Sequence, residues 1–568
     1  MNFRLEPASA LSARITLAAC FAIGLGAFSA PAHAAEPTHG MVASGHPLAT
    51  DAGLSVLKNG GNAVDAAVAV ALTLGVVDGD NAGIGGGCFL LIRRANGKFV
   101  AIDGRETAPA LATHDMFIRD GKGDTTLSQT GPLASGVPGA LAAYEYAINH
   151  YGRKKLPDVI LPAADLAERG FQLDASYANR LKGVASEMAR FESSRKVFFK
   201  GDHPLAKGDM LKQVDLAQSY RSIAQDGSRW FYHGPFASSL DRWMKENGGI
   251  MTAGDLRNYK VLFRQPLETT YRGYTIVGFP PPSSGGVHVA EMLNILEHFD
   301  LRSMPEATRL HVIAEAMKLA FADRVYWLGD PDFARVPRGL IDKRYADMLA
   351  AKIDLHRTVS VPSHGDPPGW SNDVFKKHTT HFSVADAEGN WVACTATVNT
   401  SFGSKVVIPG TGIVMNDEMD DFSTQPGVPN FFGLVGAEAN AVEAGKRPLS
   451  SMSPTIVLKD GEPLIAIGAA GGPKIISQVL LALVDMLDLG LDPVQALARP
   501  RIHHQWSPDE LMCDSTLPLE VQSELGRLGH KLSPQNGMGI AQVVARTPDY
   551  KAFTGAADPR GHGKAAGW

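Results

Sequence analysis

The sequence predicts a large α+β chain in which helices are layered on β-sheets. Segments with helical periodicity, such as 63–77, and short strand-like segments, such as 391–399, occur in both halves of the chain. Hydrophobic residues make up 45% and charged residues 20%, and the mean hydropathy is −0.05, which excludes disordered, collagen-like and polytopic membrane proteins. At about 150 residues per domain, the length of 568 residues suggests several domains.

Charge and cysteine usage narrow the possible functions. The chain has 54 basic and 59 acidic residues and a net charge of −5, so nucleic acid is not expected as a partner. Cys88, Cys394 and Cys513 are scattered and form neither a disulfide framework nor a zinc-binding spacing. Cys88 and Cys394 lie in apolar runs, which predicts that both are small buried hydrophobic residues.

The N-terminus has the features of a cleavable secretory signal over residues 1–34. Two arginines precede an apolar run at 15–30, and Ala-His-Ala at 32–34 supplies an A-x-A cleavage site. The run is too short to span a membrane comfortably, and no later stretch reaches about 18 apolar residues. Cys20 stands in a lipobox-like context, but it lies early in the apolar run, which favours export over lipidation. We therefore expect a periplasmic or secreted protein without a membrane anchor.

Two helices are predicted near the start of the mature chain, at 48–58 and 63–77. Gly60-Gly61 ends the first helix, and Asn62 caps the second, which is apolar on all sides and so should be buried. A glycine run at 83–87 then leads into a strand. The run resembles a phosphate loop, but no Walker lysine follows and the strand comes after the glycines, so close helix–strand packing is the favoured interpretation.

The middle of the chain, residues 140–350, has mostly helical patterns. A strand at 274–279 interrupts them, followed by Pro-Pro-Pro-Ser-Ser-Gly-Gly at 280–286, which suits neither a helix nor a central strand. Residues 355–378 lose periodicity and are rich in Pro, Gly, Ser and charge, so we expect an exposed, mobile linker. Beyond the linker, a buried helix is predicted at 475–487, and strands at 381–386, 391–399, 456–458, 464–467 and 542–544.

The threonine at which the linker ends is a candidate nucleophile. Thr379 follows His378 and opens a predicted strand. If the chain is cut before Thr379, its α-amine, with a pKa of about 7.7, would serve as general base for its own hydroxyl. The alternative is an ordinary β-branched residue at the start of a strand.

The hairpin that follows places two polar residues beside Thr379. Residues 386–390 fit a type I turn with a glycine in the left-handed region, a three-residue loop. Pairing the two ends of this turn makes the numbers of paired residues sum to 776, which sets Thr379 opposite Thr397. Asn399 then lies one step along on the same face. A register shift of one residue would remove this arrangement.

Long motifs follow one another through both halves of the chain. The second half contains TTHFSVAD, GNWVACTATVNTSFGS, MNDEMDDFS, KRPLSSMSPT, GAAGGPKI and PRIHHQWSPDEL. The first half contains HPLATDAGLSVLKNGGNAVDAAVA, GIGGGCF, DGRETAP and PPPSSGG. Together these motifs resemble the γ-glutamyltranspeptidases, which are N-terminal nucleophile hydrolases. The resemblance covers nearly the whole mature chain.

The resemblance implies a four-layer αββα sandwich built jointly by two subunits of one precursor. Members of the family cut themselves before the threonine of the TTH motif, here between His378 and Thr379. The products would be a large subunit, 35–378, and a small catalytic subunit, 379–568, which stay together as a heterodimer. The implied activity is that of a γ-glutamyltransferase and glutathione hydrolase, with an acyl-enzyme on Thr379. Glutathione and other γ-glutamyl compounds would be donors, and water, amino acids or peptides acceptors.

Further catalytic roles also follow from the resemblance. Thr397 matches the threonine that supports the nucleophile by hydrogen bonding, and Gly471 and Gly472 match the pair whose backbone N–H groups form the oxyanion hole. No organic cofactor is implied. No metal is expected either, because adjacent His503 and His504 on a strand would point to opposite faces, and the acidic motif MNDEMDDFS lacks EF-hand spacing.

The resemblance further assigns the residues that bind the donor's α-amino acid group. Arg105 would hold the α-carboxylate in a bidentate contact that lysine cannot copy, with hydroxyl donors from Ser450 and Ser451. The positions that match those receiving the α-ammonium are Asn399, Glu418 and Asp421. Residues 426–440 match a lid over the site. Within it, Phe432 stands where several members have a tyrosine, so no gating contact through that hydroxyl is expected.

Two other functions fit parts of the sequence. Glutaryl and cephalosporin acylases share the fold and the nucleophile, but their substrates lack the α-amine and have less need of an ammonium-binding carboxylate, so Asp421 favours γ-glutamyl donors. A non-catalytic periplasmic binding protein for glutathione would use Arg105 and Asp421, yet would need neither a cleavable junction before Thr379 nor an oxyanion hole.

Overall fold

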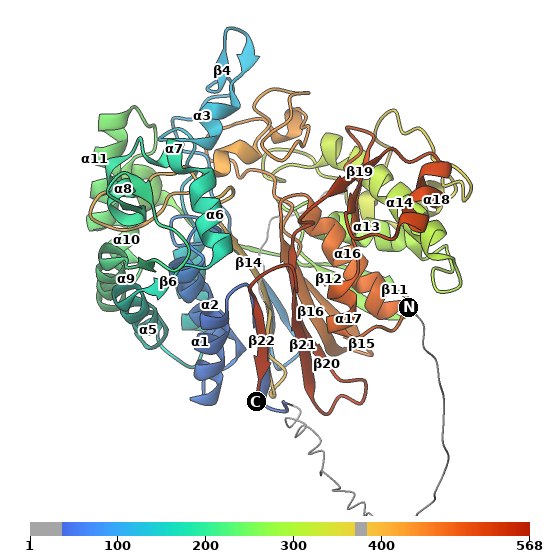
Figure 1. The fold of residues 1–568 in the computed structure, drawn as a ribbon, viewed down its shortest axis with the longest axis horizontal. Helices are drawn as coiled ribbons and strands as arrows, with labels where there is room; N and C mark the ends of the chain where they lie inside the picture. The colour runs from blue at the N-terminus through green and yellow to red at the C-terminus, as the bar shows by residue number, and fades with distance from the viewer. Residues whose placement is uncertain (1–36, 370–382) are drawn as a thin grey trace, which may run out of the picture. The chain divides into compact units, whose positions relative to one another are not determined.

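The computed structural model describes residues 37–369 and 383–568, which belong to one compact unit (Figure 1). Two β-sheets form its centre and take strands from both ends of the chain. Strand β22 (Lys564–Gly567) at the C-terminus pairs with β1 (Gly40–Ser44) near the start of the described residues. Because the two ends of the chain close one shared core, a single unit replaces the several domains that the length suggested.

Seven strands, each antiparallel to its neighbours, form the first sheet in the order β10-β3-β2-β14-β13-β1-β22. Besides β1 and β22, this sheet contains β2 (Gly87–Arg93), β3 (Phe99–Gly104), β10 (Leu262–Arg264), β13 (Ser383–Asp386) and β14 (Trp391–Thr397). Strands β13 and β14 follow the predicted cleavage junction, yet they lie between β2 and β1, which precede it.

Six antiparallel strands form the second sheet in the order β11-β12-β15-β16-β20-β21. They are β11 (Leu267–Tyr271), β12 (Tyr274–Gly278), β15 (Thr455–Lys459), β16 (Glu462–Ala470), β20 (Ile540–Arg546) and β21 (Phe553–Ala557). The strands predicted at 274–279, 391–399, 456–458, 464–467 and 542–544 are confirmed as β12, β14, β15, β16 and β20. Shorter strands form small sheets: β17 (Ile502–His503), β18 (Leu511–Asp514), β19 (Leu532–Gln535), β4 (Ile118–Arg119), β5 (Lys122–Gly123), β6 (Phe171–Gln172), β9 (Met210–Leu211), β7 (Phe199–Lys200) and β8 (His203–Pro204).

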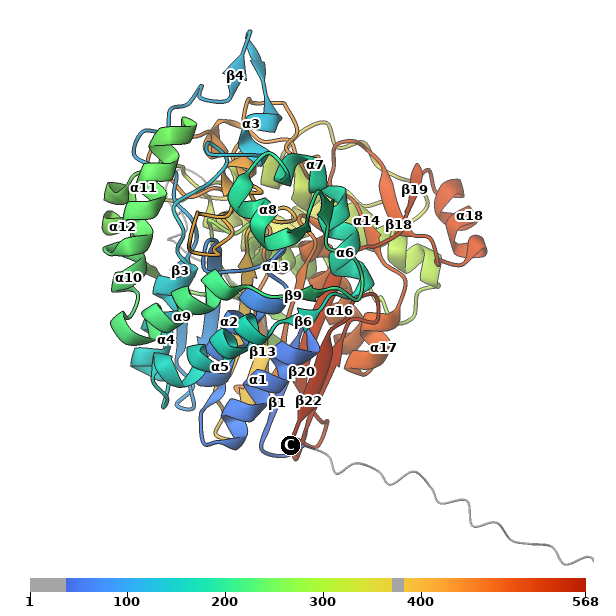
Figure 2. The same cartoon turned by 60° about the vertical axis from the view of Figure 1, so that its left-hand side comes forward.

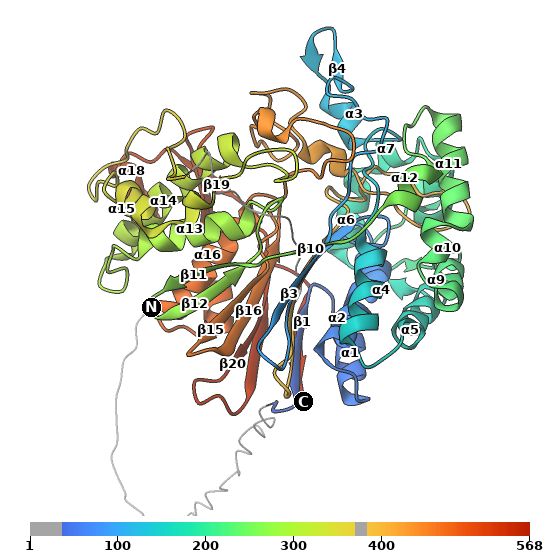
Figure 3. The ribbon, with the colours of Figure 1, turned by 180° about the vertical axis from the view of Figure 1, so that it is seen from behind.

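The two sheets pack face to face, and helices cover both outer sides, which confirms the four-layer αββα sandwich (Figure 3). Leu91 and Ala393 of the first sheet share a buried core with Val277 and Ala466 of the second. Helices α1, α2 and α4 pack on the outer face of the first sheet, and α13, α16 and α17 on that of the second. Figure 2 shows α5 and α9 stacked outside α2.

The helices on the side of the first sheet are α1 (Pro47–Lys58), α2 (Ala63–Val77), α4 (Ala140–Tyr151), α5 (Leu156–Arg169) and α9 (Val214–Asp226). Those on the side of the second sheet are α13 (Gly285–Leu296), α14 (Glu306–Trp327), α15 (Lys343–Ala350), α16 (Lys474–Leu487), α17 (Pro493–Ala498) and α18 (Leu519–Arg527). The remaining helices are α3 (Thr125–Gln129), α6 (Ala175–Gly183), α7 (Ala185–Met188), α8 (Glu192–Phe198), α10 (Arg229–Tyr232), α11 (Pro235–Asn247) and α12 (Ala253–Asn258). Within the described ranges, no helix combines the length and hydropathy that crossing a membrane requires.

Helix α2 forms as its sequence predicts. The Asn62 side chain accepts the backbone N–H groups of Val64 and Asp65, and the Asp65 carboxylate accepts that of Asn62, which is a capping box. All 15 residues of the helix are buried. Cys88 and Cys394 belong to the same core, so the prediction that they are small buried residues is confirmed.

The glycine run before β2 allows two stretches of backbone to touch. A Cβ atom at Gly86 would lie 1.9 Å from the carbonyl oxygen of Thr397, and one at Gly85 would lie 2.0 Å from that of Val414. Both distances are far below van der Waals contact, so only glycine fits at these two positions. The run thus provides close packing, as the favoured interpretation predicted, and fixes the end of β14.

The first part of the predicted linker packs against the unit. Val359 donates its N–H to Glu315 (2.9 Å), and the Trp506 indole donates to the carbonyl of Val361 (2.7 Å). Residues 355–369 contain no helix or strand, as the loss of periodicity predicted, but these contacts anchor residues that were expected to be mobile. Residues 370–378 lie outside the described residues.

Candidate active site

A cavity of about 240 Å³ lies where strands β14 and β16 end. The segments that line it come from distant parts of the chain and include the 3-10 turn η2 (Glu418–Asp421) and the start of α16. Nine of the predicted site residues line this one cavity: Arg105, Thr397, Asn399, Glu418, Asp421, Ser450, Ser451, Gly471 and Gly472. His378 and Thr379, which were predicted to form the cleavage site, lie outside the described residues.

Strand β14 carries Thr397 to the edge of the cavity. Strands β13 and β14 pair with Ser383 opposite Ala393, so their residue numbers sum to 776, and the predicted hairpin register is confirmed over the described residues. Asn399, with φ of 78°, donates its backbone N–H to Thr397 Oγ1 over 2.8 Å. Because this oxygen acts as an acceptor, the Thr397 hydroxyl hydrogen is available to another acceptor.

The turn between β16 and α16 presents two backbone donors. Gly471 has φ of 137° and Gly472 has φ of 59°, which glycine adopts without steric cost. No described residue accepts the N–H of either glycine. Two adjacent N–H groups at the wall of a cavity can stabilise an oxygen that becomes negatively charged.

Arg105 forms the buried floor of the cavity. Its guanidinium donates to Glu418, to Asp421 Oδ2 over 2.5 Å and to the carbonyl of Pro448 over 3.1 Å. A third carboxylate, Glu106, lies 3.7 Å away. Burial acts to lower the pKa of Arg105, but the three carboxylates outweigh it and raise the pKa, so the arginine stays charged.

Three carboxyl groups surround the single positive charge of Arg105. Burial raises the pKa of Glu106 to about 8 and the pKa of Glu418 well above its usual value, although Arg105 opposes both shifts. Both oxygens of Glu106 and Oε2 of Glu418 accept no hydrogen bond from the described residues. The cavity therefore has surplus carboxylate capacity, which suits a ligand that brings a cationic group.

Ser450 and Ser451 form another wall. Ser450 Oγ accepts the backbone N–H of Met452 over 3.2 Å, and Ser451 Oγ accepts from Arg324 over 3.0 Å. The sequence analysis missed Arg324, because it lies inside the long helix α14 and no motif distinguishes it from an ordinary charged helical residue.

The predicted lid segment, 426–440, covers the glycine turn. A Cβ atom at Gly472 would lie 2.5 Å from the ring of Phe432, so this ring packs directly against Gly472. Gln505 donates its side-chain N–H to the carbonyl of Gly433 over 3.0 Å, and Phe431 donates its N–H to Asp420 over 3.0 Å. These two bonds hold the segment over the cavity.

The histidines have partners within the chain. His503 is hydrogen-bonded to Ser477 (2.5 Å) and His504 to Asp509 (3.0 Å), so the two adjacent rings contact different partners, as predicted for structural roles. Burial lowers the pKa of His503 to about 3.

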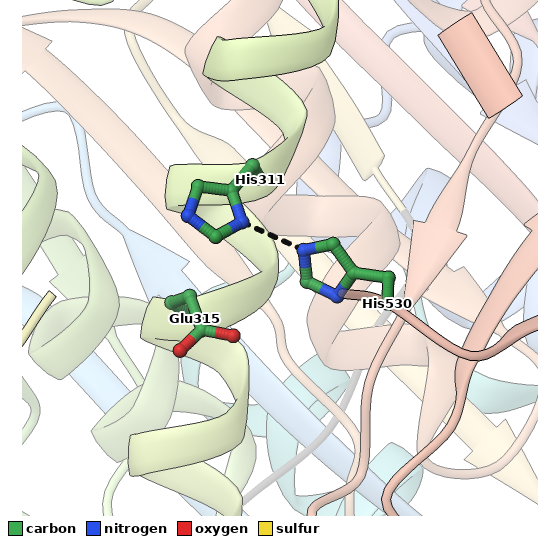
Figure 4. A group of neighbouring side chains, drawn as sticks. All are labelled: His311, Glu315 and His530. Atoms are coloured by element: carbon green, nitrogen blue, oxygen red, sulfur yellow. Dashed lines mark hydrogen bonds between the residues drawn. The ribbon is translucent and has the colours of Figure 1, made fainter. Parts of the chain in front are cut away.

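A second group has the composition of a metal site. Donor atoms of His311, Glu315 and His530 lie within 4.8 Å of one another, and the two rings are joined at 2.7 Å (Figure 4). His311 also bonds the carbonyl of Asp354 (2.7 Å), and the Lys318 ammonium lies 2.8 Å from Glu315. Because a lysine cation already pairs with the carboxylate, this group is better explained as an anchor for the segment after α15.

Comparison with known proteins adds to the geometry. The sequence model of the family described as gamma-glutamyltranspeptidase matches residues 49–568. The chain is 45% identical over 533 residues to the glutathione hydrolase proenzyme of Escherichia coli, covering 93% of this chain and 91% of that protein. It is 39% identical to the acylase ACY 1 proenzyme of Pseudomonas sp. strain SE83, covering 93% of each. The crystal structure of a cephalosporin acylase from Bacillus halodurans is similar with a TM-score of 0.84 at 28% identity, covering 96% of this chain and 98% of that one.

Proposed function

The chain belongs to the γ-glutamyltranspeptidase family, and we propose that it is a γ-glutamyltransferase and glutathione hydrolase with an N-terminal threonine nucleophile. The observation that carries the proposal is the cavity that joins Arg105, surplus carboxylates and two backbone N–H groups. A γ-glutamyl amide presents a carboxylate, an ammonium and a carbonyl that becomes an oxyanion. Each part of the cavity thus has a matching group on the donor.

The donor's α-amino acid group is proposed to insert between Arg105 and Asp421. These side chains contact each other in the structure. The α-carboxylate would replace Asp421 on Arg105 Nη2, and the α-ammonium would pair with Asp421, so every charge keeps a partner. The other proposed contacts are Glu418 and Asn399 to the ammonium, and Ser450 and Ser451 to the carboxylate.

Thr379 is proposed as the nucleophile. Ser383 pairs with Ala393 in the predicted register, and the proposal takes this register to continue to Thr379, which would then lie opposite Thr397. The Thr379 amine would take the proton of its own hydroxyl while Oγ attacks the γ-carbonyl carbon, and Gly471 and Gly472 would stabilise the oxyanion. As the C–N bond breaks, the leaving amine takes that proton. Water or an amine then attacks the ester and releases glutamate or a new γ-glutamyl compound.

We further propose that the chain is a precursor that cuts itself between His378 and Thr379. Relatives carry proenzyme in their names, and the cut would free the amine that the mechanism needs. The products would be 35–378 and 379–568, a heterodimer. Residues 1–34 are proposed to direct export to the periplasm or the medium.

An acylase is the second candidate, because similar proteins include an acylase ACY 1 proenzyme and a cephalosporin acylase. A glutaryl side chain would keep the carboxylate but lack the ammonium. It would leave Glu418 and Asp421 without a cationic partner from the ligand, whereas a γ-glutamyl group supplies one. The surplus of carboxylates around Arg105 therefore favours the γ-glutamyl donor.

The test compares kcat/KM for γ-glutamyl-p-nitroanilide and glutaryl-p-nitroanilide, which differ only in the α-amine. We expect the processed enzyme to prefer the γ-glutamyl compound by about 100-fold or more, the effect of one buried charge partner. Equal rates or a glutaryl preference would assign the chain to the acylases. A chain that binds γ-glutamyl compounds but turns over neither donor would be a binding protein.

A further inference from the structure

We infer that Arg324 is a second guanidinium of the carboxylate subsite, which acts on the donor through the hydroxyl of Ser451. It is a positioning residue, and the inference rests on the proposed function, since it concerns how the α-carboxylate of a γ-glutamyl donor is held. Arg324 lies in helix α14 and is buried, with 4% of its surface exposed. It contacts the wall of the cavity through its hydrogen bond to Ser451.

The hydrogen bonds of Arg324 determine where two hydroxyl groups point. Its Nη2 donates to Ser451 Oγ and its Nε donates to Ser284 Oγ, each over 3.0 Å. An oxygen that accepts from a guanidinium must direct its own hydrogen elsewhere. Ser284 directs its hydrogen to the carbonyl of Ser450 over 2.7 Å. Ser451 Oγ makes no further hydrogen bond to the described residues, and it lines the cavity, so its hydrogen is available to a ligand.

The neighbouring serine is arranged in the same way. Ser450 Oγ accepts the N–H of Met452, which leaves its hydroxyl hydrogen for the cavity as well. Two O–H donors from residues that line one cavity suit the two oxygens of a carboxylate.

The segment Pro-Pro-Pro-Ser-Ser-Gly-Gly holds this wall in place. Ser284 donates its N–H to the carbonyl of Ser450 over 2.8 Å, and Ser450 donates its N–H to the carbonyl of Pro282 over 2.8 Å. Arg324 thus ties both sides of this contact together. The motif, whose role sequence analysis left open, forms the frame of the carboxylate subsite.

The charge distribution gives Arg324 a function beyond packing. Arg105 already contacts the carboxyl groups of Glu418 and Asp421, and Glu106 lies nearby, so a ligand carboxylate that relied on Arg105 alone would compete with these groups for the guanidinium. No described carboxylate forms an ion pair with Arg324, since Asp421 pairs with Arg105. Burial lowers the pKa of Arg324 to about 10, opposed only by Asp421. A buried cation whose hydrogen bonds go to neutral hydroxyl groups is costly, and an α-carboxylate bound nearby would reduce this cost.

The test uses three donors that differ in the charged groups on the carbon corresponding to the α-carbon of glutamate. The p-nitroanilides of γ-glutamate, glutarate and 4-aminobutanoate carry both charged groups, only the carboxylate, and only the amine. We expect Arg324→Met to raise KM for the γ-glutamyl donor by about 10- to 100-fold, the effect of one hydrogen bond to a charged group, with kcat within about 3-fold. Turnover of the 4-aminobutanoyl compound, which has no carboxylate, should not change.

Two further variants separate positioning from folding. Arg309→Met is the matched control, because Arg309 is buried on the same helix and bonds the carbonyl of Met304. This control variant should leave the kinetics with all three donors unchanged. The double variant Arg324→Met with Ser451→Ala should lose no more kcat/KM for the γ-glutamyl donor than the more damaging of the two single variants. The reason is that the guanidinium acts through that hydroxyl. If Arg324→Met does not fold, Arg324→Lys replaces it in the same cycle.

The outcomes are distinct. The inference would be overturned if Arg324→Met lost the same kcat/KM with all three donors or left the KM for the γ-glutamyl donor unchanged. Additive losses of kcat/KM in the double variant would also overturn it. A second measurement distinguishes failure of this inference from failure of the proposed function. It compares how much L-glutamate and 4-aminobutanoate each raise the melting temperature of the wild type and of Arg324→Met. A wild type that does not prefer L-glutamate would contradict both, whereas a preference retained in Arg324→Met would contradict the inference alone.

Discussion

In the proposed function, Arg105 and the carboxyl groups around it determine which donors the cavity accepts. The guanidinium is paired with Glu418 and Asp421, so a donor carboxylate that binds it exchanges with one of these partners. A zwitterion makes this exchange without leaving a buried charge unpaired, whereas a ligand with one charge does not. In this proposal, selectivity for the α-amino acid group arises from the ion pair that the group replaces.

Replacing Asp421 should therefore change donor selectivity. We expect Asp421→Asn to lower kcat/KM for γ-glutamyl-p-nitroanilide by about 100-fold, because the ammonium loses its charged partner. The glutaryl compound should be unaffected or improved. Asp460→Asn, in an exposed turn between β15 and β16, is the control and should leave both rates unchanged. A parallel loss for both donors would show that Asp421 maintains the fold and does not recognise the ammonium.

Thr397 allows a prediction that depends on a single hydroxyl. Its oxygen accepts from Asn399, so its hydrogen is free for the nucleophile. We expect Thr397→Val to lower kcat by about 10-fold or more with little change in KM, and Thr397→Ser to retain most activity. Steady-state kinetics on processed enzyme decide the matter, and a full rate for Thr397→Val would remove the proposed role.

Strand β14 keeps its position through the glycine run before β2. Gly86 faces the carbonyl of Thr397 so closely that an added methyl group must displace one of the two chains. We expect Gly86→Ala to destabilise the protein by about 1–3 kcal/mol or more, the usual range for overpacking, and to abolish turnover. Gly83→Ala is the matched control, since a Cβ there meets no atom within 4 Å. Equal melting temperatures for the two variants would contradict this account of the run.

The buried histidines after β17 and before β19 predict sensitivity to acid. Burial and the neighbouring His311, His504 and Lys318 lower the pKa of His530 to about 3. As pH falls, His530 binds a proton at about pH 6.5 in the unfolded chain but only at lower pH in the folded chain. Its contribution to stability is therefore present above about pH 6.5 and is lost as pH falls toward 3. The cost approaches about 1.4 kcal/mol per pH unit for this one group.

The variant His530→Gln removes the titrating group and keeps a side-chain N–H that can donate to His311. Between pH 6.5 and pH 4.5, a window set by the usual histidine pKa of about 6.5, its melting temperature should fall less than that of the wild type. Other groups that face this site, Glu315 and Lys318 among them, are common to both proteins and cancel in the difference. Identical slopes in the two proteins would contradict the prediction.

In the whole molecule, the two proposed subunits share both sheets. In the first sheet β14 and β13 lie between β2 and β1, and in the second β15, β16, β20 and β21 extend β11 and β12. Separating 35–378 from 379–568 would break strand pairs in both sheets. We expect the cut heterodimer to elute as one species at any dilution and to separate only when it unfolds. Dissociation under native conditions would argue against this arrangement.

Processing itself is predicted to depend on one residue. Thr379→Ala should remain a single uncut chain, because the alanine has no hydroxyl to attack the preceding peptide bond. Denaturing gels of freshly purified and aged protein report the cut. Normal cleavage of the variant would mean that another group drives processing.

The hairpin register was predictable because it depends on local turn chemistry. The ends of the loop at 386–390 fix every pair along β13 and β14, including Ser383 with Ala393. Contacts between distant residues were not predictable in this way. Arg105 meets Asp421 across 316 positions, and Arg324 meets Ser451 across 127, so neither contact has a local pattern. The motifs named Arg105 and Asp421 as binding residues, but only packing shows that they contact each other and that Arg324 supports the serines.

Intact-mass spectrometry of the denatured protein, with and without excess γ-glutamyl donor, tests the central claim most directly. The account predicts two chains, with the smaller beginning at Thr379 and gaining the mass of one γ-glutamyl group when donor is present. A single uncut chain that still turns over the donor, or an adduct on the larger chain, would contradict it.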